Sequence, residues 1–260
     1  MLMRILREPQ VYLVGRQATH DAEIERFLAD HDVSQWSTDT SVAGEKLCEI
    51  AGRLCYMSFA KPRPGGNEAY IERLLEVGHG SVLEHSVWNF IITGVSRSFT
   101  HELVRHRAGF GFSQLSQRYV DESVADFVEP DCIADDPELH EVWRSAVEHA
   151  QEAYVRLVLG LERTFASEPD ATLRRKLARQ AARSVLPNAT ETKIFVTANT
   201  RALRHFIELR ASEHAEVEIR RVAATILDIV RREAPNLFGD YQIRELPDGT
   251  RVADTDHRKV

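Results

Sequence analysis

The residues best suited to chemistry lie in one run from Arg105 to Tyr119, which reads RHRAGFGFSQLSQRY. Three cationic or titratable residues come first, and the glycines that follow let backbone N–H groups approach a ligand closely. Hydroxyl, amide and guanidinium donors then gather within residues 113–118. Such donors suit a phosphate group or the edge of a nucleobase. The run therefore predicts a binding site for a small anionic ligand such as a nucleotide.

Known phosphate-binding motifs do not match this run. No GK[ST] triplet follows the glycines, so a P-loop is excluded, and Gly109-Phe110-Gly111 does not continue to the dinucleotide pattern GxGxxG. A purely structural alternative stays open for Arg105 to Arg107, because cations at the end of a helix interact favourably with its dipole. That alternative does not explain the cluster of donors that follows.

Charge is unevenly distributed along the chain. The net charge is −7, which disfavours nonspecific binding to nucleic acid. Arginines nevertheless concentrate in residues 174–183 and 201–221. An acidic protein with an arginine-rich half is typical of one that binds phosphates and carboxylates. The alternative is a set of solvated helix faces whose arginines pair with glutamates.

The cysteines and the hydropathy indicate a protein of the cytoplasm. No stretch approaches the roughly 20 apolar residues of a membrane-spanning helix, and the N-terminus is interpreted as a lead into a strand rather than a signal peptide. Cys48 and Cys55 lie seven apart in a predicted helix, about 10 Å between Cα atoms, too far for a disulfide. Both are expected to face the core, and Cys132 is expected in a loop. We expect no metal site.

Hydrophobic periodicity predicts an α+β fold, a single domain of residues 1–260 in which helices outnumber strands. The predicted strands are 11–15, 87–95, 192–199 and an edge strand at 241–246. The predicted helices are 42–56, 67–77 with Asn67 as N-cap, one through HELVRHR capped by Ser96 or Ser98, 137–167, 171–185, 201–211 and 214–234. Breaks are expected at KPRPGG (61–66) and GHGS (78–81), a loop at 108–119, and a polar tail at about 247–260.

Several motifs in this order resemble the flavin-dependent thymidylate synthases. RHR followed by SQLSQRY resembles the signature of that family, and other segments resemble it over a core of about residues 45–235. These segments are GRLCYMS (52–58), EVGHGSVLEH (76–85), ITGVSRSFTHELVRHR (92–107), RQAARSVLPNATET (179–192) and TANTRALRHFIELRASEHAEVEIRR (197–221). The resemblance implies the fold of that family, in which long helices pack on a mainly antiparallel sheet, and a homotetramer with active sites shared between subunits.

The resemblance also implies an FAD site and a nucleotide site. The flavin would contact Ser81, Arg105, His106, Arg107, Gln114, Asn199, Arg201 and His205. The nucleotide dUMP would contact Glu102, Leu103, Val104, Arg105, Gln114, Leu115, Ser116, Gln117, Arg118, Arg183 and Arg210. Ser116 is interpreted as a positioning donor, because no base for activating a nucleophile is apparent by spacing. Glu102 and Arg105, three apart, are expected on one helix face.

The catalytic residue implied by the resemblance is Arg210. A guanidinium beside the uracil ring can stabilise negative charge that develops on N3 and O4, whereas an arginine stays protonated and cannot act as a base. The implied reaction is methylation of dUMP at C5, with the one-carbon unit from methylenetetrahydrofolate and the electrons from NADPH through FAD. No cysteine nucleophile is required, which fits cysteines that lie outside the signature run.

One departure from the family pattern keeps a second substrate open. The family has seven residues between RHR and the serine, whereas this chain has eight, Ala108 to Leu115. The longer loop motivates an alternative in which UMP is the acceptor. A nucleotide- or RNA-binding protein without catalysis is a remote alternative, opposed by the net charge and by the lack of aromatic–basic interleaving in residues 170–185. A metal-dependent hydrolase is also remote, because the histidines are scattered and no HExxH occurs.

Overall fold

The structure of the protein is a computed structural model that describes residues 3–61 and 64–260. Its contacts separate two compact units. The first unit contains residues 1–10, 92–105 and 113–195, and the second contains residues 11–91, 106–112 and 196–260. None of the described helices is long and apolar enough to cross a membrane. Part of the predicted breaker KPRPGG, residues 62 and 63, lies outside the described residues.

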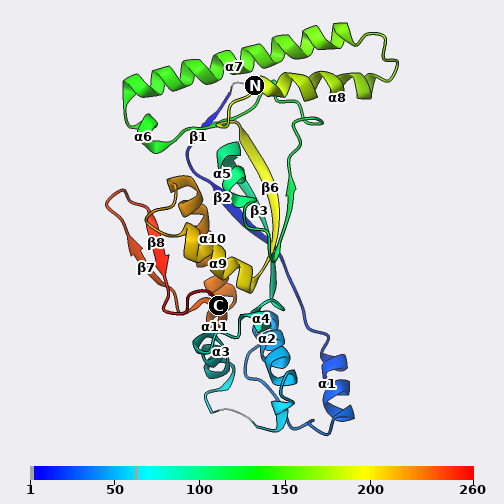
Figure 1. Cartoon of the computed structure of the whole chain (residues 1–260), viewed down its shortest axis with the longest axis vertical. Coiled ribbons are helices and arrows are strands. Elements are labelled where there is room, and N and C mark those ends of the chain that lie inside the picture. The colour runs from blue at the N-terminus through cyan, green and yellow to red at the C-terminus, as the bar shows by residue number, and fades with distance from the viewer. Residues whose placement is uncertain (1–2, 62–63) are drawn as a thin grey trace. The chain divides into compact units, whose positions relative to one another are not determined.

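Helices and an antiparallel sheet make up the fold, as the sequence predicts (Figure 1). The main sheet has the strand order β2-β3-β6-β4. Its strands are β2 (Gln10–Arg16), β3 (Val87–Ser96), β6 (Glu191–Asn199) and β4 (Phe110–Gln114). Along β3 every side chain is buried or half-buried, which explains why the predicted strand at 87–95 is mostly apolar. The predicted strands 11–15, 87–95 and 192–199 are thus confirmed.

The first unit continues β3 into a helix that carries part of the predicted site. Helix α5 (Arg97–Leu103) begins directly after Ser96, whose Oγ accepts a hydrogen bond from the backbone N–H of Phe99 at 3.1 Å. This bond satisfies one donor of the first turn, so Ser96, and not Ser98, is the N-cap. The helix ends at Leu103, so the prediction that it runs through Arg107 is wrong.

A long helical pair completes the first unit. Helix α7 (Pro137–Thr164) starts at the N-cap Asp136, and α8 (Ala171–Ala182) packs along it (Figure 1). The predicted apolar stripe of α7 is only partly buried: Val147 packs in a cluster around Phe127, whereas Leu157 is exposed. The remaining elements of this unit are β1 (Ile5–Leu6), which pairs in parallel with β5 (Phe127–Val128), α6 (Asp131–Ala134) and a 3-10 turn, η2 (Arg183–Val185).

The N-terminal part of the second unit is a group of helices that buries an ion pair and an asparagine beside its apolar core. They are α1 (Asp21–Asp30), α2 (Ala43–Leu54), η1 (Ser58–Ala60), α3 (Gly66–Glu76) and α4 (Gly80–Leu83). The Arg53 guanidinium pairs with Glu49 at 2.8 Å, and both side chains are almost fully buried. Asn67 donates to the same Glu49 carboxylate at 2.8 Å. Asn67 therefore ties α3 to α2, and its predicted role as N-cap is wrong, since Gly65 occupies that position.

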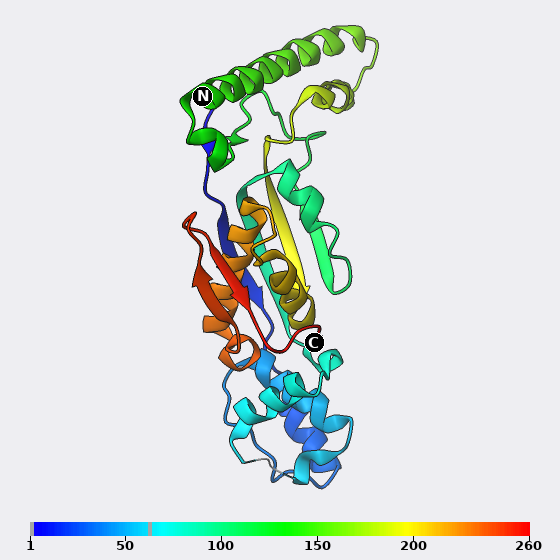
Figure 2. The ribbon, with the colours of Figure 1, turned by 60° about the vertical axis from the view of Figure 1, so that its left-hand side comes forward.

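The C-terminal part of the second unit holds the elements that present the second half of the predicted site. Helix α9 (Thr200–Arg210) follows β6, and α10 (Val217–Glu233) and α11 (Pro235–Phe238) come next. Strands β7 (Gln242–Glu245) and β8 (Arg251–Asp254) form an antiparallel hairpin that lies along α10 in both views (Figures 1 and 2). The prediction of a polar tail after residue 247 is wrong, because Val252 and Ala253 are buried here.

Two further predictions fail for local reasons. The segment 108–119 contains a strand, β4, because Phe110, Phe112 and Gln114 alternate with exposed residues while the glycines hide the period of two. Cys55 is exposed although Cys48 is buried, because α2 ends at Leu54 and the chain turns away from the helical face. The cysteines are free, as predicted, and burial and the nearby Glu45 charge raise the pKa of Cys48 to about 12.

Candidate functional site

Apart from Arg210, the predicted nucleotide-binding residues belong to the first unit, on α5 and after it, at the end of β4 and after it, and at Arg183. Gln114 donates from Nε2 to Thr100 Oγ1 at 3.0 Å and to Thr192 Oγ1 at 3.3 Å, which joins the signature run to α5 and β6. The backbone N–H of Leu115 donates to Lys193 O at 2.9 Å. Because these bonds fix Gln114 and Leu115, they also set the position of the hydrogen-bond donors at residues 116–118.

The turn after Leu115 presents the predicted positioning donors. Ser116 Oγ accepts from the backbone N–H of Arg118 at 3.3 Å, so this hydroxyl caps the turn. Gln117 is buried and Arg118 is half-buried with its guanidinium 6.0 Å from the Tyr119 ring centroid. No ionisable base is recorded in a hydrogen bond with Ser116 within the described residues, so the interpretation as a donor rather than a nucleophile is retained.

Residues 102–105 occupy the end of α5 and the turn after it. Glu102 is on the helix, but Arg105 lies past its end, so the two do not share a helix face as predicted. Arg105 is exposed, and its Nε donates to His101 O at a weak 3.4 Å. The Leu103 side chain is buried in the core and so positions α5, whereas the Val104 side chain is exposed.

A partly buried arginine that the sequence did not single out supports this region. Arg97 donates from Nη2 to Leu115 O at 2.9 Å, and its Nε is buried without a hydrogen-bond partner in the described part of the chain. Burial lowers the pKa of Arg97, with the Arg183 charge acting in the same direction, whereas Glu122 and Glu191 oppose them. The exposed Arg183 therefore lies near Arg97, and the carboxylates of Glu122 and Glu191 offset part of the positive charge of the two arginines.

The second unit brings together three of the predicted flavin contacts. Asn199, Arg201 and His205 line one cavity of about 350 Å³, together with Ala108 and Gly109 from the signature run. Asn199 is the N-cap of α9, because its Oδ1 accepts from Ala202 N at 2.8 Å. Arg201 and His205 are four apart and share one helix face, as predicted. The Arg201 guanidinium pairs with Glu84 at 2.6 Å.

Gly109 is required where the signature run meets α9. Its φ of +74° lies in the left-handed region, and a Cβ there would come within 2.7 Å of Asn199 Nδ2. Its carbonyl accepts from the backbone N–H of Asn199 at 3.1 Å. A glycine is therefore the residue that lets this loop close onto the cavity.

His106 and Arg210 form a pair in the second unit. Arg210 is the last residue of α9, and its Nε donates to His106 Nε2 at 3.1 Å. Since an arginine can only donate, Nε2 accepts, and the imidazole is the neutral form with its proton on Nδ1. The His106 ring is packed between Phe206 and His205, with ring centroids at 5.1 and 6.2 Å. Arg107 is exposed and does not line the cavity.

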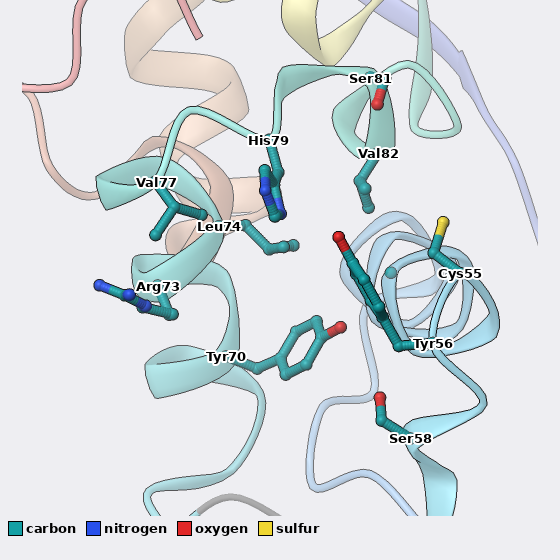
Figure 3. A pocket seen from close by; sticks show the side chains of 11 residues that line it. Cys55, Tyr56, Ser58, Tyr70, Arg73, Leu74, Val77, His79, Ser81 and Val82 are labelled. Atoms are coloured by element: carbon teal, nitrogen blue, oxygen red, sulfur yellow. The ribbon is translucent and has the colours of Figure 1, made fainter.

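Ser81 does not line that cavity but lines a second one of about 410 Å³ within the same unit. Tyr56, Tyr70 and His79 surround this space from three different segments, with Ser81 at its upper edge (Figure 3). The Tyr56 side chain is largely exposed. The aromatic rings around this cavity suit a planar ring system, although the sequence singled out only Ser81.

Within residues 3–61 and 64–260, no group of three or more His, Cys, Asp or Glu side chains has the arrangement of a metal site. The eleven histidines of the sequence therefore form no such cluster in that part. The two cavities instead present cationic, amide and aromatic side chains.

Comparison with known proteins identifies the family. The family described as "thymidylate synthase complementing protein" matches residues 38–236. A flavin-dependent thymidylate synthase of Mycobacteroides abscessus is 56% identical over 229 residues, 87% of this chain and 90% of that protein. The chain belongs to the flavin-dependent thymidylate synthases. Proteins of the same name from Mycobacterium avium and Mycobacterium tuberculosis are 54% and 52% identical over the same shares of both chains.

Solved structures support the fold of this family. The crystal structure of a UMP/dUMP methylase from Streptomyces cacaoi bound with 5-Br dUMP aligns with a TM-score of 0.68 and 22% identity, over 91% of this chain and 96% of that one. The same methylase bound with 5-Br UMP gives a TM-score of 0.62 and 21% identity. At these identities the likeness establishes the fold alone. A flavin-dependent thymidylate synthase is an enzyme, so the predicted fold class, enzyme class and flavin dependence are confirmed.

Sequence reasoning missed some residues at these sites. Some of them could have been found from the sequence, and others could not. Arg97, Tyr56 and His79 lie inside segments that already resembled the family, so a scan of those segments for aromatic and cationic side chains would have found them. Lys259 and Val260, which line the first cavity, lie outside those segments. They reach the cavity only because the chain returns to α9 after the β7–β8 hairpin.

Proposed function

We propose that this enzyme methylates dUMP at C5, with FAD as the flavin, methylenetetrahydrofolate as the one-carbon donor and NADPH as the reductant. The observation that carries the proposal is the convergence of Asn199, Arg201 and His205 with Gly109 on one cavity, in a chain 56% identical to a flavin-dependent thymidylate synthase. The names of such relatives support dUMP as the acceptor. We further propose a cytoplasmic homotetramer with shared active sites.

The residues around the cavity fit part of a flavin dinucleotide. Arg201 supplies a cation for a phosphate, Asn199 supplies an amide donor, and Gly109 leaves room for close approach of the backbone. A cavity of about 350 Å³ holds a portion of so large a cofactor. Flavin, when bound, supplies the hydride that completes the methyl group. The protein binds and orients the flavin and the nucleotide, and it polarises the uracil ring.

Arg210 is proposed to stabilise charge on the uracil ring. Its Nε–H donates to His106 Nε2, and this bond fixes one edge of the guanidinium. A fixed, permanently charged donor costs no reorganisation when negative charge develops on N3 and O4. Thr100, Thr192 and Arg97 would hold the signature run so that Gln114, Ser116 and Arg118 meet the nucleotide.

UMP is the second acceptor to be tested, because the signature loop has eight residues between Arg107 and Ser116. Names of relatives that are more than half identical favour dUMP. We expect product from dUMP and a kcat/KM for UMP below a hundredth of that for dUMP. The experiment is a steady-state assay with FAD, methylenetetrahydrofolate and NADPH, with each nucleotide in a separate reaction. Equal rates on both would replace the dUMP proposal by a ribose-tolerant site, and no product on either would contradict the proposed reaction.

A further inference from the structure

The segment of residues 255–260 is fixed along α9 by hydrogen bonds. Thr255 Oγ1 donates to Asp240 Oδ2 at 2.5 Å, and the Asp240 carboxylate also receives two bonds from the buried Arg204 on α9 at 2.7 Å each. One turn further along α9, Glu208 Oε2 accepts from the backbone N–H of Lys259 at 3.1 Å. Val260 is buried. These contacts hold the segment in a defined place beside the helix.

That place is the rim of the candidate flavin cavity. Arg204 and Glu208 hold the segment, while Arg201 and His205 on the adjacent positions of α9 line the cavity together with Lys259 and Val260. The segment also touches the turn before Ser81. A Cβ on Gly80 would lie 2.6 Å from the carbonyl carbon of Val260 and 2.8 Å from Arg201 Nε, so Gly80 permits this close packing.

The charges around the cavity leave a role for another cation. The Arg201 guanidinium is already paired with Glu84, so these two side chains together contribute little net positive charge to the cavity. The Lys259 ammonium makes no recorded ion pair within the described residues. The Lys259 backbone, whose N–H is bonded to Glu208, lies in the left-handed region at a φ of +62°. L residues with side chains adopt that conformation rarely, so it is maintained by the anchored segment.

We propose that Lys259 is a further flavin-binding residue, whose ammonium neutralises phosphate charge of the dinucleotide, and that residues 255–260 form one wall of its pocket. The inference rests on the proposed function, because it takes the cavity of Arg201 and His205 to be the flavin site. It assigns the ligand chemistry of this wall to the diphosphate and not to the ring system. An ammonium near a phosphate forms a charge-assisted hydrogen bond, which salt weakens when the site is open to solvent.

The test measures the dissociation constants of FAD and riboflavin for the flavin-free full chain by fluorescence quenching. Lys259→Ala should weaken FAD binding about fivefold to tenfold, and Lys259→Glu should weaken it further, because an exposed charge-assisted bond is lost and then replaced by repulsion. Riboflavin carries no phosphate, so its affinity should not change in either variant. Raising the salt concentration should reduce the difference between wild type and variants for FAD.

The matched control is Arg232→Glu, because Arg232 is an exposed cation of α10 in the same unit and does not line the cavity. It should bind FAD as the wild type does, and thermal melts of all flavin-free variants should coincide. If Lys259→Glu binds FAD as tightly as the wild type, or if riboflavin weakens equally, the inference is wrong and the proposed function stands. If the wild type binds no FAD at all, both the inference and the proposed function are wrong.

Discussion

Replacing Arg210 with glutamine is expected to lower kcat for methylation of dUMP by about a hundredfold or more, the effect of removing one fixed electrostatic donor from a transition state. Glutamine keeps a hydrogen-bond donor near His106 but removes the positive charge that would stabilise N3 and O4 of the uracil. Arg210→Lys should fall between the wild type and the glutamine variant, since lysine keeps the charge but lacks the planar fork. The measurement is single-turnover formation of thymidylate at saturating dUMP.

Two readouts separate this role from a structural one. Arg210 does not line the cavity of Arg201 and His205, so the variant should retain bound FAD and its reduction by NADPH. Arg232→Gln, which removes an exposed arginine of α10, is the matched control and should methylate dUMP at the wild-type rate. A rate for Arg210→Gln within threefold of the wild type would remove Arg210 from the chemistry.

Asp240→Ala is expected to destabilise the second unit by about 3–5 kcal/mol, the usual cost of leaving a buried charge without its partner. The Arg204 side chain is only 2% exposed, and its guanidinium bonds both carboxylate oxygens of Asp240. Burial raises the pKa of Asp240, but hydrogen bonds and charge from Arg204 outweigh it, so the pKa lies below its ordinary value. A depressed pKa gives stability at neutral pH that is lost as the pH falls through the acidic range.

Urea unfolding near pH 7 measures this loss, and the same experiment near pH 3 should show a smaller difference between variant and wild type. The control is Glu213→Ala, which breaks the exposed pair with Arg244 and should cost at most about 1 kcal/mol. The double variant Arg204→Met, Asp240→Leu should recover much of the lost stability, because apolar groups replace a buried pair at low cost. Equal losses for Asp240→Ala and Glu213→Ala would contradict this account of the pair.

The sequence predicts the elements with strong periodicity and fails where local patterns are short or masked. The strand at 87–95 and the helix at 137–167 agree with β3 and α7 within a few residues. The strand β4 is hidden because Gly109 and Gly111 break an alternation that the phenylalanines carry. The hairpin β7–β8 is only half predicted, because its second strand is a short polar segment that is buried by contact with α9 and α10.

In the candidate site, too, some residues could be predicted from the sequence and others depend on tertiary contacts. Resemblance to the family assigned Asn199, Arg201 and His205, and their spacing alone places the last two on one helix face. Spacing misjudged the helix end, so Arg105 was expected on α5 and lies beyond it. Lys259 is distant in sequence from every signature motif, and its position depends on tertiary contacts with Glu208, which no local pattern reveals.

The central claim is that reduced flavin supplies the hydride for methylation of dUMP. Its most direct test is to run the reaction in D₂O and to measure the mass of the thymidylate by mass spectrometry. A hydrogen on nitrogen of a reduced flavin exchanges with water, whereas a C–H hydrogen of methylenetetrahydrofolate does not. A flavin-dependent synthase therefore places a deuterium in the new methyl group, and we predict a product methyl of CH₂D composition. A methyl group containing only protium would show that the hydride came from folate and would contradict the proposed reaction.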